Sequence, residues 1–364
     1  MKKNSSRSAI IAVMLLGLLL FGIGSYAWST ASDIFQPVSP SGQGKTIPIE
    51  IVKGESTAQI ADVLQSKGLI RNALAFRIWA RIKGLDTRLQ AGIYHKLNTS
   101  MTISDITDQL LDAQPDAIRV VIPEGWRIEQ IAQRFANSGL VRFNAQDFLK
   151  YARNINTFPD AGKYPILKIV PQDRPTMEGL LFPASYEVPV DSTAINVIDM
   201  MLKATSDTIQ QNHLDQIAQQ HQMNLYQMLT LASIVERETL FDEDRAKIAS
   251  VYWNRLYHPN AETVGLLQAD PTVQYARDTL KAPQTYWTPL DDVGGNIAAG
   301  SPWNTYVNKG LPPTPICSPG LASMQVAAAP PQTNLYFFLA KKDGHSVFEA
   351  TLAQFLQDKQ KYLP

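Results

Sequence analysis

Residues 225–256 read LYQMLTLASIVERETLFDEDRAKIASVYWNRL, and this stretch predicts two consecutive helices. In its first part, apolar side chains recur three and four positions apart, which is the spacing of one helix face. These side chains are Leu225, Met228, Leu229, Ala232 and Val235. The first helix is expected to end at two glutamates, Glu236 and Glu238. Asp242 is expected to cap the second helix. The inward-facing side chains of that helix are Ile248, Val251, Tyr252 and Leu256.

The two glutamates lie at opposite edges of the apolar stripe on a helical wheel, and Arg237 is expected on the polar side. Glu238 lies nearer the C-terminal end of the helix, where the helix dipole disfavours a negative charge. Loss of solvation beside Ile234 and Val235 would also raise its pKa. A raised pKa suits a general acid at neutral pH. The alternative is that both glutamates are surface charges at a helix end, and the pattern alone favours this alternative.

Charge and composition exclude several classes of function. The 364 residues contain 33 basic and 33 acidic side chains, without the basic excess that is typical of nucleic-acid binders. Cys317 is the only cysteine, so no intrachain disulfide can form, and a small packed side chain is expected there. The five histidines are scattered, and neither HExxH nor CxxC occurs. The sequence therefore predicts no nucleic-acid partner, no metal and no other cofactor.

The N-terminal segment predicts a membrane anchor. Residues 9–28 carry no charge, and roughly 20 apolar residues suffice to cross a bilayer. Basic side chains within residues 1–8 place this tail in the cytoplasm by the positive-inside rule. Residues 29–45 are rich in Ser, Pro and Gly and are expected to form a linker. A cleaved signal peptide is the alternative, although its apolar region is normally only about 7–15 residues long. In either case most of the chain is exported.

Residues 46–116 predict a small unit with the order strand, helix, helix, strand. Apolar residues alternate with polar ones at Ile47, Ile49 and Ile51, which is the period of a half-buried strand. Ser56 and Asn72 are suited to cap the two helices. A second strand is expected within residues 89–97 and a further helix at about residues 102–113. The order resembles that of a LysM module, which implies glycan binding, whereas a packing or spacer unit is the alternative.

The opening of this unit recurs 71 residues further along the chain. Residues 54–70 and 125–141 share a glycine, an amphipathic helix pattern and a glycine followed by two apolar residues. A fixed period of this kind predicts two related strand–turn–helix units.

Residues 117–364 predict a larger α+β domain with several polar motifs. Residues 178–186 read EGLLFPASY, so Glu178 lies among apolar side chains, where an acid is either paired or close to a site. Gln268, Asp270 and Thr272 can exchange hydrogen bonds with sugar hydroxyls and acetamides. The segment 304–320 is rich in proline and glycine, and it is expected to form a rigid loop that walls a groove.

These motifs, in this order, resemble the YceG-like (MltG) family of endolytic murein transglycosylases. The most specific matches are LASIVERET at 231–239, NRL at 254–256, Gln268 with DPTV at 270–273, and the loop 304–320. The second glutamate of the family's ASIxExET pattern is the catalytic one, and it falls on Glu238. The chain departs from the family's usual residues at Ala269, Trp303, His345 and Phe355, which leaves the Glu238 motif intact.

The resemblance implies a catalytic domain outside the plasma (inner) membrane of a single-pass protein, acting on peptidoglycan glycan strands. The implied reaction cleaves MurNAc-β-1,4-GlcNAc bonds within a strand and gives 1,6-anhydromuramyl ends. It also implies that nascent strands are terminated, in company with cell-wall synthases. Glu238 is the expected catalytic residue. The residues expected to position the strand are Gln268, Asp270, Asn304, Tyr306 and Glu178. Two alternatives remain, namely a non-catalytic glycan-binding scaffold and a hydrolase that uses Asp270 or Glu236 as a second carboxylate.

Overall fold

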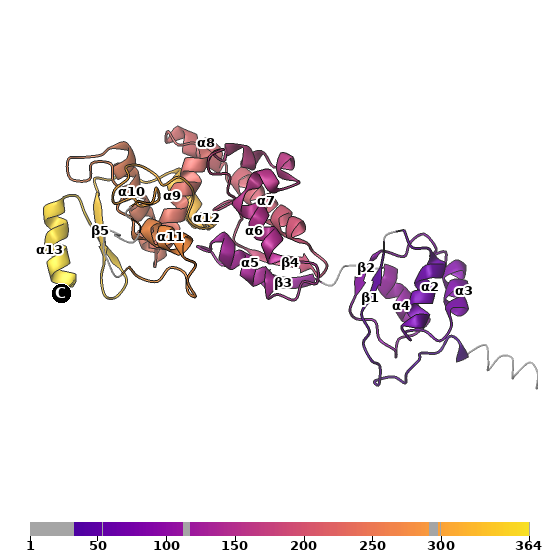
Figure 1. The fold of residues 1–364 in the computed structure, drawn as a ribbon. Helices are drawn as coiled ribbons and strands as arrows, with labels where there is room; N and C mark the ends of the chain where they lie inside the picture. The colour runs from indigo at the N-terminus through magenta and orange to yellow at the C-terminus, as the bar shows by residue number, and fades with distance from the viewer. Residues whose placement is uncertain (1–32, 53, 112–116, 291–297, 299, 364) are drawn as a thin grey trace, which may run out of the picture. The chain divides into compact units, whose positions relative to one another are not determined.

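The computed structural model describes residues 33–52, 54–111, 117–290, 298 and 300–363. The chain divides into two units (Figure 1). One runs to Ala117 and includes Pro189–Asp191, and the other comprises Ile118–Val188 and Ser192–Pro364. Both contain helices and short antiparallel strand pairs, so the α+β class is confirmed. The predicted membrane segment 9–28 lies outside the described residues. Within the described ranges no helix is both long and apolar enough to cross a membrane.

The first unit has the predicted order of strand, helix, helix, strand. Strand β1 (Ile49–Ile51) pairs antiparallel with β2 (Gly92–Tyr94), and helices α2 (Thr57–Ser66) and α3 (Ala73–Ile82) lie between them in the sequence. Helix α4 (Ile103–Leu111) follows. Strand β2 is shorter than the expected strand within 89–97. A relation to LysM modules stays a prediction.

The two helices of the first unit begin where their caps were expected. The Ser56 side chain accepts a hydrogen bond from the Gln59 backbone N–H, and Asn72 accepts one from the backbone N–H of Ala75. Each bond satisfies one of the N–H groups that have no partner within the first turn of a helix. Buried side chains from both helices and both strands then form one core between these elements.

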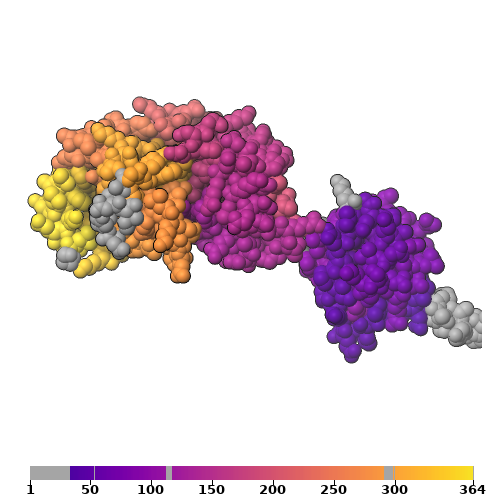
Figure 2. All heavy atoms as spheres, in the orientation of Figure 1, coloured from indigo at the N-terminus to yellow at the C-terminus, as the bar shows by residue number. Residues whose placement is uncertain are grey.

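The second unit holds the remaining elements, and its core is a large apolar cluster beside a small one formed by Val273, Ala276 and Ala298. Figure 2 shows its magenta segments and its orange and yellow segments packed into one continuous body. Its sheets are two-stranded, and they pair β3 with β4 and β5 with β6. The elements are β3 (Ala117–Val121), α5 (Ile128–Ala136), α6 (Ala145–Arg153), three short 3-10 turns (Ile155–Thr157, Ala161–Lys163, Pro165–Ile169), β4 (Ser185–Pro189), α7 (Ala194–Gln211), α8 (Leu214–Gln220), α9 (Leu225–Glu238), α10 (Asp242–Tyr257), α11 (Asp270–Leu280), α12 (Leu321–Ala328), β5 (Phe337–Ala340), β6 (Ser346–Glu349) and α13 (Leu352–Tyr362).

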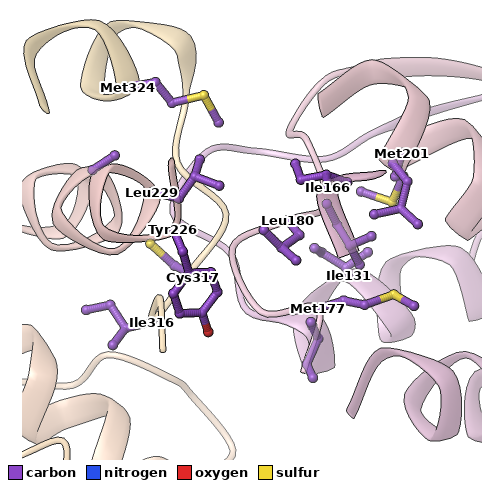
Figure 3. Packing of buried hydrophobic residues seen from close by; sticks show 14 of the residues in the cluster. Ile131, Ile166, Met177, Leu180, Met201, Tyr226, Leu229, Ile316, Cys317 and Met324 are labelled. Atoms are coloured by element: carbon purple, nitrogen blue, oxygen red, sulfur yellow. The ribbon is translucent and has the colours of Figure 1, made fainter. Parts of the chain in front are cut away.

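Helix α9 is the centre of this unit. It has the predicted bounds, and it packs against α8, α10, α11 and α12. Figure 3 shows Tyr226 and Leu229 of α9 in the same apolar cluster as Cys317 and Met324. Every residue from Met228 to Val235 is buried, so α9 is enclosed on all sides and not only along the expected stripe. Ser233 and Thr230 tolerate this because their hydroxyls donate to backbone carbonyls.

Two local expectations about this region are wrong. Asp242 is the first residue of α10 and not its cap; the residue before the helix is Phe241, whose side chain provides no capping bond. Asp242 pairs with Arg245 at 2.6 Å instead. Arg237 does not point to a polar side, since its guanidinium lies 4.3 Å from the ring centre of Trp287. A tertiary partner that is distant in sequence overrides the polar preference of that helix position.

The recurring pattern at residues 54–70 and 125–141 corresponds to a recurring structure. Helices α2 and α5 begin at Thr57 and Ile128. The glycine before each helix has a positive φ, 98° at Gly54 and 74° at Gly125. Only glycine adopts such angles without strain, so the sequence repeat reflects two turns of the same kind.

Candidate active site

The carboxyl group of Glu238 ends α9 and receives a hydrogen bond from α10. The hydroxyl of Tyr252 donates to Oε1 of Glu238 at 2.6 Å. Tyr252 is 1% exposed and is held edge-on against Phe338 at 5.7 Å between ring centres. Glu238 is partly buried as a residue, and its carboxyl is oriented by the core. A buried tyrosine hydroxyl needs a partner, and here that partner fixes the direction of an acid.

Arg255 lies one helical turn after Tyr252 and joins α10 to the segment before α11. Its Nη1 donates to the backbone O of Leu267 at 2.5 Å and lies 3.5 Å from Oε1 of Gln268. Its Nε donates to the carbonyl of Tyr336 at 2.7 Å. The guanidinium is nearly buried, and its planar fork satisfies three separate oxygens. It therefore places Gln268 and a positive charge beside Glu238.

Asp270 and Tyr306 form the opposite side of this group. The hydroxyl of Tyr306 donates to Oδ1 of Asp270 at 2.6 Å. Backbone and hydroxyl bonds through Thr305 tie the two segments together, since Gln268 N donates to Thr305 O at 3.1 Å and Ala269 N donates to Thr305 Oγ1 at 3.0 Å. Gln268 has a positive φ of 54°, a strained conformation that turns the chain just before α11.

The pKa of Glu238 is raised to about 7. Burial is the largest cause, and the negative charge of Asp270 adds to it. The hydrogen bond from Tyr252 and the charges of Arg255 and Arg237 act in the opposite direction. The group is therefore close to half protonated at neutral pH, the state in which a carboxyl can first give and then take a proton. The direction agrees with the expectation from the sequence.

Two of the expected strand-positioning residues lie deeper in the protein. Asn304 is fully buried; its amide donates to Ala298 O at 3.4 Å, and its Oδ1 accepts from Tyr306 N at 3.0 Å. It braces the loop that carries Tyr306. Glu178 is also fully buried and lies in a separate cluster, where it accepts from Ile128 N at 3.2 Å and from the Tyr275 hydroxyl at 3.3 Å. Burial leaves neither side chain able to touch a polymer in this structure.

The Glu178 cluster is electrostatically distinct from the Glu238 group. Burial raises the pKa of Glu178 well above its ordinary value, and the charge of Glu129 adds to this effect. The opposing positive charge is that of Arg127, which is 2% exposed and donates to Thr279 Oγ1 at 2.8 Å. This cluster joins the start of α5 to α11. Of the two options for Glu178, paired or close to a site, the contacts of this cluster agree with a paired acid.

The other glutamate of α9, Glu236, holds the proline-rich loop. Its Oε2 accepts from the backbone N–H of Gly320 at 3.0 Å and lies 3.5 Å from Nη1 of Arg245. Ile316 N donates to Ser233 Oγ at 3.0 Å, so the same loop is fixed to α9 at a second point. The carboxyl of Glu236 is thus bound by the scaffold, whereas within the described residues the carboxyl of Glu238 accepts a hydrogen bond from the hydroxyl of Tyr252 alone.

Sequence reasoning missed Tyr252 and Arg255 as members of the site. Tyr252 was expected on the inward face of its helix, and a phenol on an apolar face signals a buried hydrogen-bond partner. Arg255 stands one turn later on the same face, where an arginine between apolar residues gives the same signal. Of the residues expected to position the strand, Tyr306 donates to Asp270, whose charge acts on Glu238, and Gln268 lies 3.5 Å from Arg255.

The fold and this group define an α+β protein in which a glutamate at a helix end accepts a hydrogen bond from a buried tyrosine. The chain matches the YceG-like family over residues 49–361 and belongs to it. It is 30% identical over 346 residues to an endolytic murein transglycosylase of Bacillus subtilis (strain 168), which covers 93% of this chain and 90% of the relative. The identity to a protein of the same name from Streptococcus pneumoniae serotype 2 (strain D39) is 28% over 354 residues, or 93% and 62% of the two chains.

A solved structure shares the fold. The crystal structure of a YceG-like protein from Listeria monocytogenes superposes with a TM-score of 0.54 at 32% identity, covering 87% of this chain and 100% of that one. The resemblance deduced from the motifs is thereby confirmed. The expected enzyme class, a peptidoglycan lytic transglycosylase, agrees with the names of the curated relatives.

Proposed function

We propose that the chain is a membrane-anchored endolytic lytic transglycosylase that cleaves MurNAc-β-1,4-GlcNAc bonds within peptidoglycan glycan strands. The observation that carries the proposal is Glu238, a carboxyl with a pKa of about 7 that a buried tyrosine orients at a partly exposed helix end. The names of the curated relatives support the same reaction.

The reaction needs one group that donates a proton and then accepts one. Protonated Glu238 gives its proton to the glycosidic oxygen while the bond from that oxygen to the muramyl C1 breaks. The resulting carboxylate then takes the proton of the muramyl C6 hydroxyl, and this O6 forms the new bond to C1. The muramyl sugar leaves as a 1,6-anhydro ring, GlcNAc leaves with a free hydroxyl, and no water is consumed. A pKa near the working pH serves both steps because neither transfer is strongly uphill.

The neighbours of Glu238 take supporting roles in this scheme. The negative charge of Asp270 raises the pKa of Glu238 and would stabilise the positive charge that develops at C1. Tyr306 orients Asp270 through its 2.6 Å bond. The side chain of Gln268 offers an amide to a sugar acetamide or hydroxyl. Asn304 and Glu178 act indirectly, by bracing the loop and the helices that surround the group.

The proposal includes the location of the enzyme. Residues 1–8 lie in the cytoplasm, 9–28 span the plasma (inner) membrane, 29–45 form a linker, 46–116 form a LysM-like glycan-binding subdomain and 117–364 form the catalytic domain outside the membrane. An endolytic cut close to the membrane would end the growth of nascent strands, which places the enzyme beside cell-wall synthases. The uncharged segment 9–28 and the basic residues before it support this arrangement.

Digestion of purified peptidoglycan by the full chain in detergent micelles tests the reaction. Mass spectrometry should show long glycan fragments that end in anhydromuramyl groups, as expected for cleavage within a strand. Reducing ends would indicate a hydrolase, for which Asp270 is the available second carboxylate, and an absence of fragments would indicate a binding scaffold. The Glu238→Gln variant, which cannot donate a proton, serves as the control.

A further inference from the structure

A cavity of the larger unit lies along α5, and none of the residues that line it belongs to the Glu238 group. Its volume is about 340 Å³, near the small end of the range of ligand pockets, which suits a single ring. Its lining includes Trp126, Gln130, Gln133, Arg134, Asn137 and Tyr286. Four of these residues follow one another at spacings of three and four along and just beyond α5, so they present one face of that helix.

The polar groups of this lining are free to bind. Gln133, Arg134 and Asn137 are exposed, and across the ranges that the structure describes their side chains have no hydrogen bond or ion pair. Gln130 uses its Oε1 to accept from Trp287 Nε1 at 3.2 Å, which leaves its NH2 group available. The side-chain amides of Gln133 and Asn137 can both donate and accept hydrogen bonds, as the hydroxyls and acetamide groups of a sugar require.

Two aromatic residues of the lining have defined neighbours. The backbone of Trp126 forms an antiparallel bridge with Ser318, in which Ser318 N donates to Trp126 O at 2.8 Å and Gly125 N donates to Ser318 O at 2.8 Å. The ring of Tyr286 lies 5.1 Å from the guanidinium of Arg127. Aromatic rings in a cavity lining offer an apolar face beside polar groups, and the ring face of a hexose is apolar in the same way.

The cavity is joined to the end of α9 through two contacts. Trp287 bonds to Gln130 on the cavity side, and Arg237 stacks on Trp287 at 4.3 Å on the other side. Arg237 precedes Glu238 directly in the sequence. The cavity on α5 and the end of α9 therefore belong to the same packed unit, and one polymer could bind at both.

We propose that this cavity binds one sugar ring of the glycan strand, away from the bond that is cut. This inference rests on the proposed function, because it assumes that the glycan strand bound at Glu238 also reaches the cavity. Trp126 and Tyr286 stack on the ring, while Gln133 and Asn137 bind its hydroxyl or acetamide groups. The cavity would hold the strand, and none of its residues would take part in the cleavage step.

Calorimetric titration of the full chain in detergent micelles measures this binding. The protein carries Glu238→Gln so that the ligand is not cut, and the ligand is a hexasaccharide of alternating GlcNAc and MurNAc without stem peptides. Adding Gln133→Ala with Asn137→Ala should raise Kd about tenfold, since each substitution removes about one hydrogen bond. Both side chains are exposed, so the fold is expected to persist, which thermal unfolding checks. The matched control is Gln146→Ala, an exposed glutamine on the neighbouring helix α6 that does not line the cavity.

An unchanged Kd in the double variant, or no binding of the hexasaccharide to the Glu238→Gln protein, would overturn the proposal. Binding of a muramyl peptide in place of the peptide-free hexasaccharide would overturn it too. Product analysis with the otherwise unaltered chain separates this result from the reaction itself. Anhydro ends together with an unchanged Kd would remove the subsite alone. A Kd that depends on Gln133 and Asn137 without anhydro ends would keep the glycan site and remove the transglycosylase.

Discussion

Tyr252 donates a 2.6 Å hydrogen bond to Oε1 of Glu238, and this contact joins the last residue of one helix to the core of the next. The bond stabilises the ionised form of the carboxyl and so lowers its pKa, whereas burial and Asp270 raise it. The proton affinity of Glu238 is therefore a balance between neighbours that can be changed one at a time.

Removing the hydroxyl in Tyr252→Phe is expected to raise the pKa of Glu238. The alkaline limb of the pH profile of kcat/KM should move to higher pH, because the acid keeps its proton longer. Loss of orientation should also lower kcat about tenfold, which corresponds to one hydrogen bond. Tyr164→Phe is the matched control, since Tyr164 donates to Asp199 at 2.8 Å from another part of the unit. An equal effect of both substitutions would refute a specific role for Tyr252.

Asp270→Asn should move the same limb in the opposite direction. The charge of Asp270 raises the pKa of Glu238, so a neutral amide lets the acid lose its proton at lower pH. Activity above pH 7 should fall further than it does in the parent chain, as a series of initial rates across pH would show. A limb that stays in place would mean that Asp270 is electrostatically remote from the acid.

The pH dependence of stability should reveal Glu238 independently of activity. The folded-state pKa of about 7 lies above the ordinary glutamate value of 4.5, so between these values the folded state binds more protons than the unfolded state. The free energy of unfolding contributed by this group therefore falls as pH rises from about 4.5 through 7. Glu238→Gln lacks this loss, so its Tm relative to the parent should increase over that window and level off above it. A constant difference in Tm across the window would contradict the raised pKa.

Glu236→Gln is expected to weaken the fold rather than to change the products. The substitution removes the charge that faces Arg245 at 3.5 Å, and it weakens the 3.0 Å bond from Gly320 N because an amide oxygen is a weaker acceptor than a carboxylate. Thermal unfolding should show a loss of about 1–3 kcal/mol, the usual effect of breaking a partly buried charged hydrogen bond. Mass spectrometry should still find anhydro ends at low temperature. Complete loss of products in a folded Glu236→Gln protein would favour the hydrolase, with Glu236 as a second carboxylate.

Gly179→Ala should destabilise the chain because a methyl group has no room there. Gly179 has a φ of +76°, and an added Cβ would lie 2.3 Å from Cβ of Pro315. A rigid proline and a backbone carbonyl cannot yield easily, so a loss of about 1–3 kcal/mol is expected in denaturant titrations. Gly162→Ala is the control, since its added Cβ meets nothing within 4 Å. Equal stability of the two variants would show that the loop at Pro315 moves freely.

Local features of the fold could be predicted because they depend on residues close in sequence. The bounds of α9 follow from apolar spacing, and the roles of Ser56 and Asn72 follow from capping. Contacts between distant residues could not be read in this way. Arg237 reaches Trp287 across the fold, so the helical wheel placed it on the wrong side.

The site was predictable in its members and not in their arrangement. The wheel could not separate Glu236 from Glu238, since the difference lies in tertiary partners, Gly320 for one and Tyr252 for the other. Asn304 and Glu178 have the residue types of a sugar-binding site, yet the structure uses both of them inside the protein. A polar residue type does not by itself show whether its hydrogen-bond partners lie inside the protein or on a ligand.

The enclosure of α9 by its neighbours has a consequence for how a long polymer meets this protein. A residue at the tip of a fully packed helix cannot travel toward an incoming chain. Under the proposed function, the glycan strand has to move to a fixed Glu238, because the carboxyl cannot move to the strand.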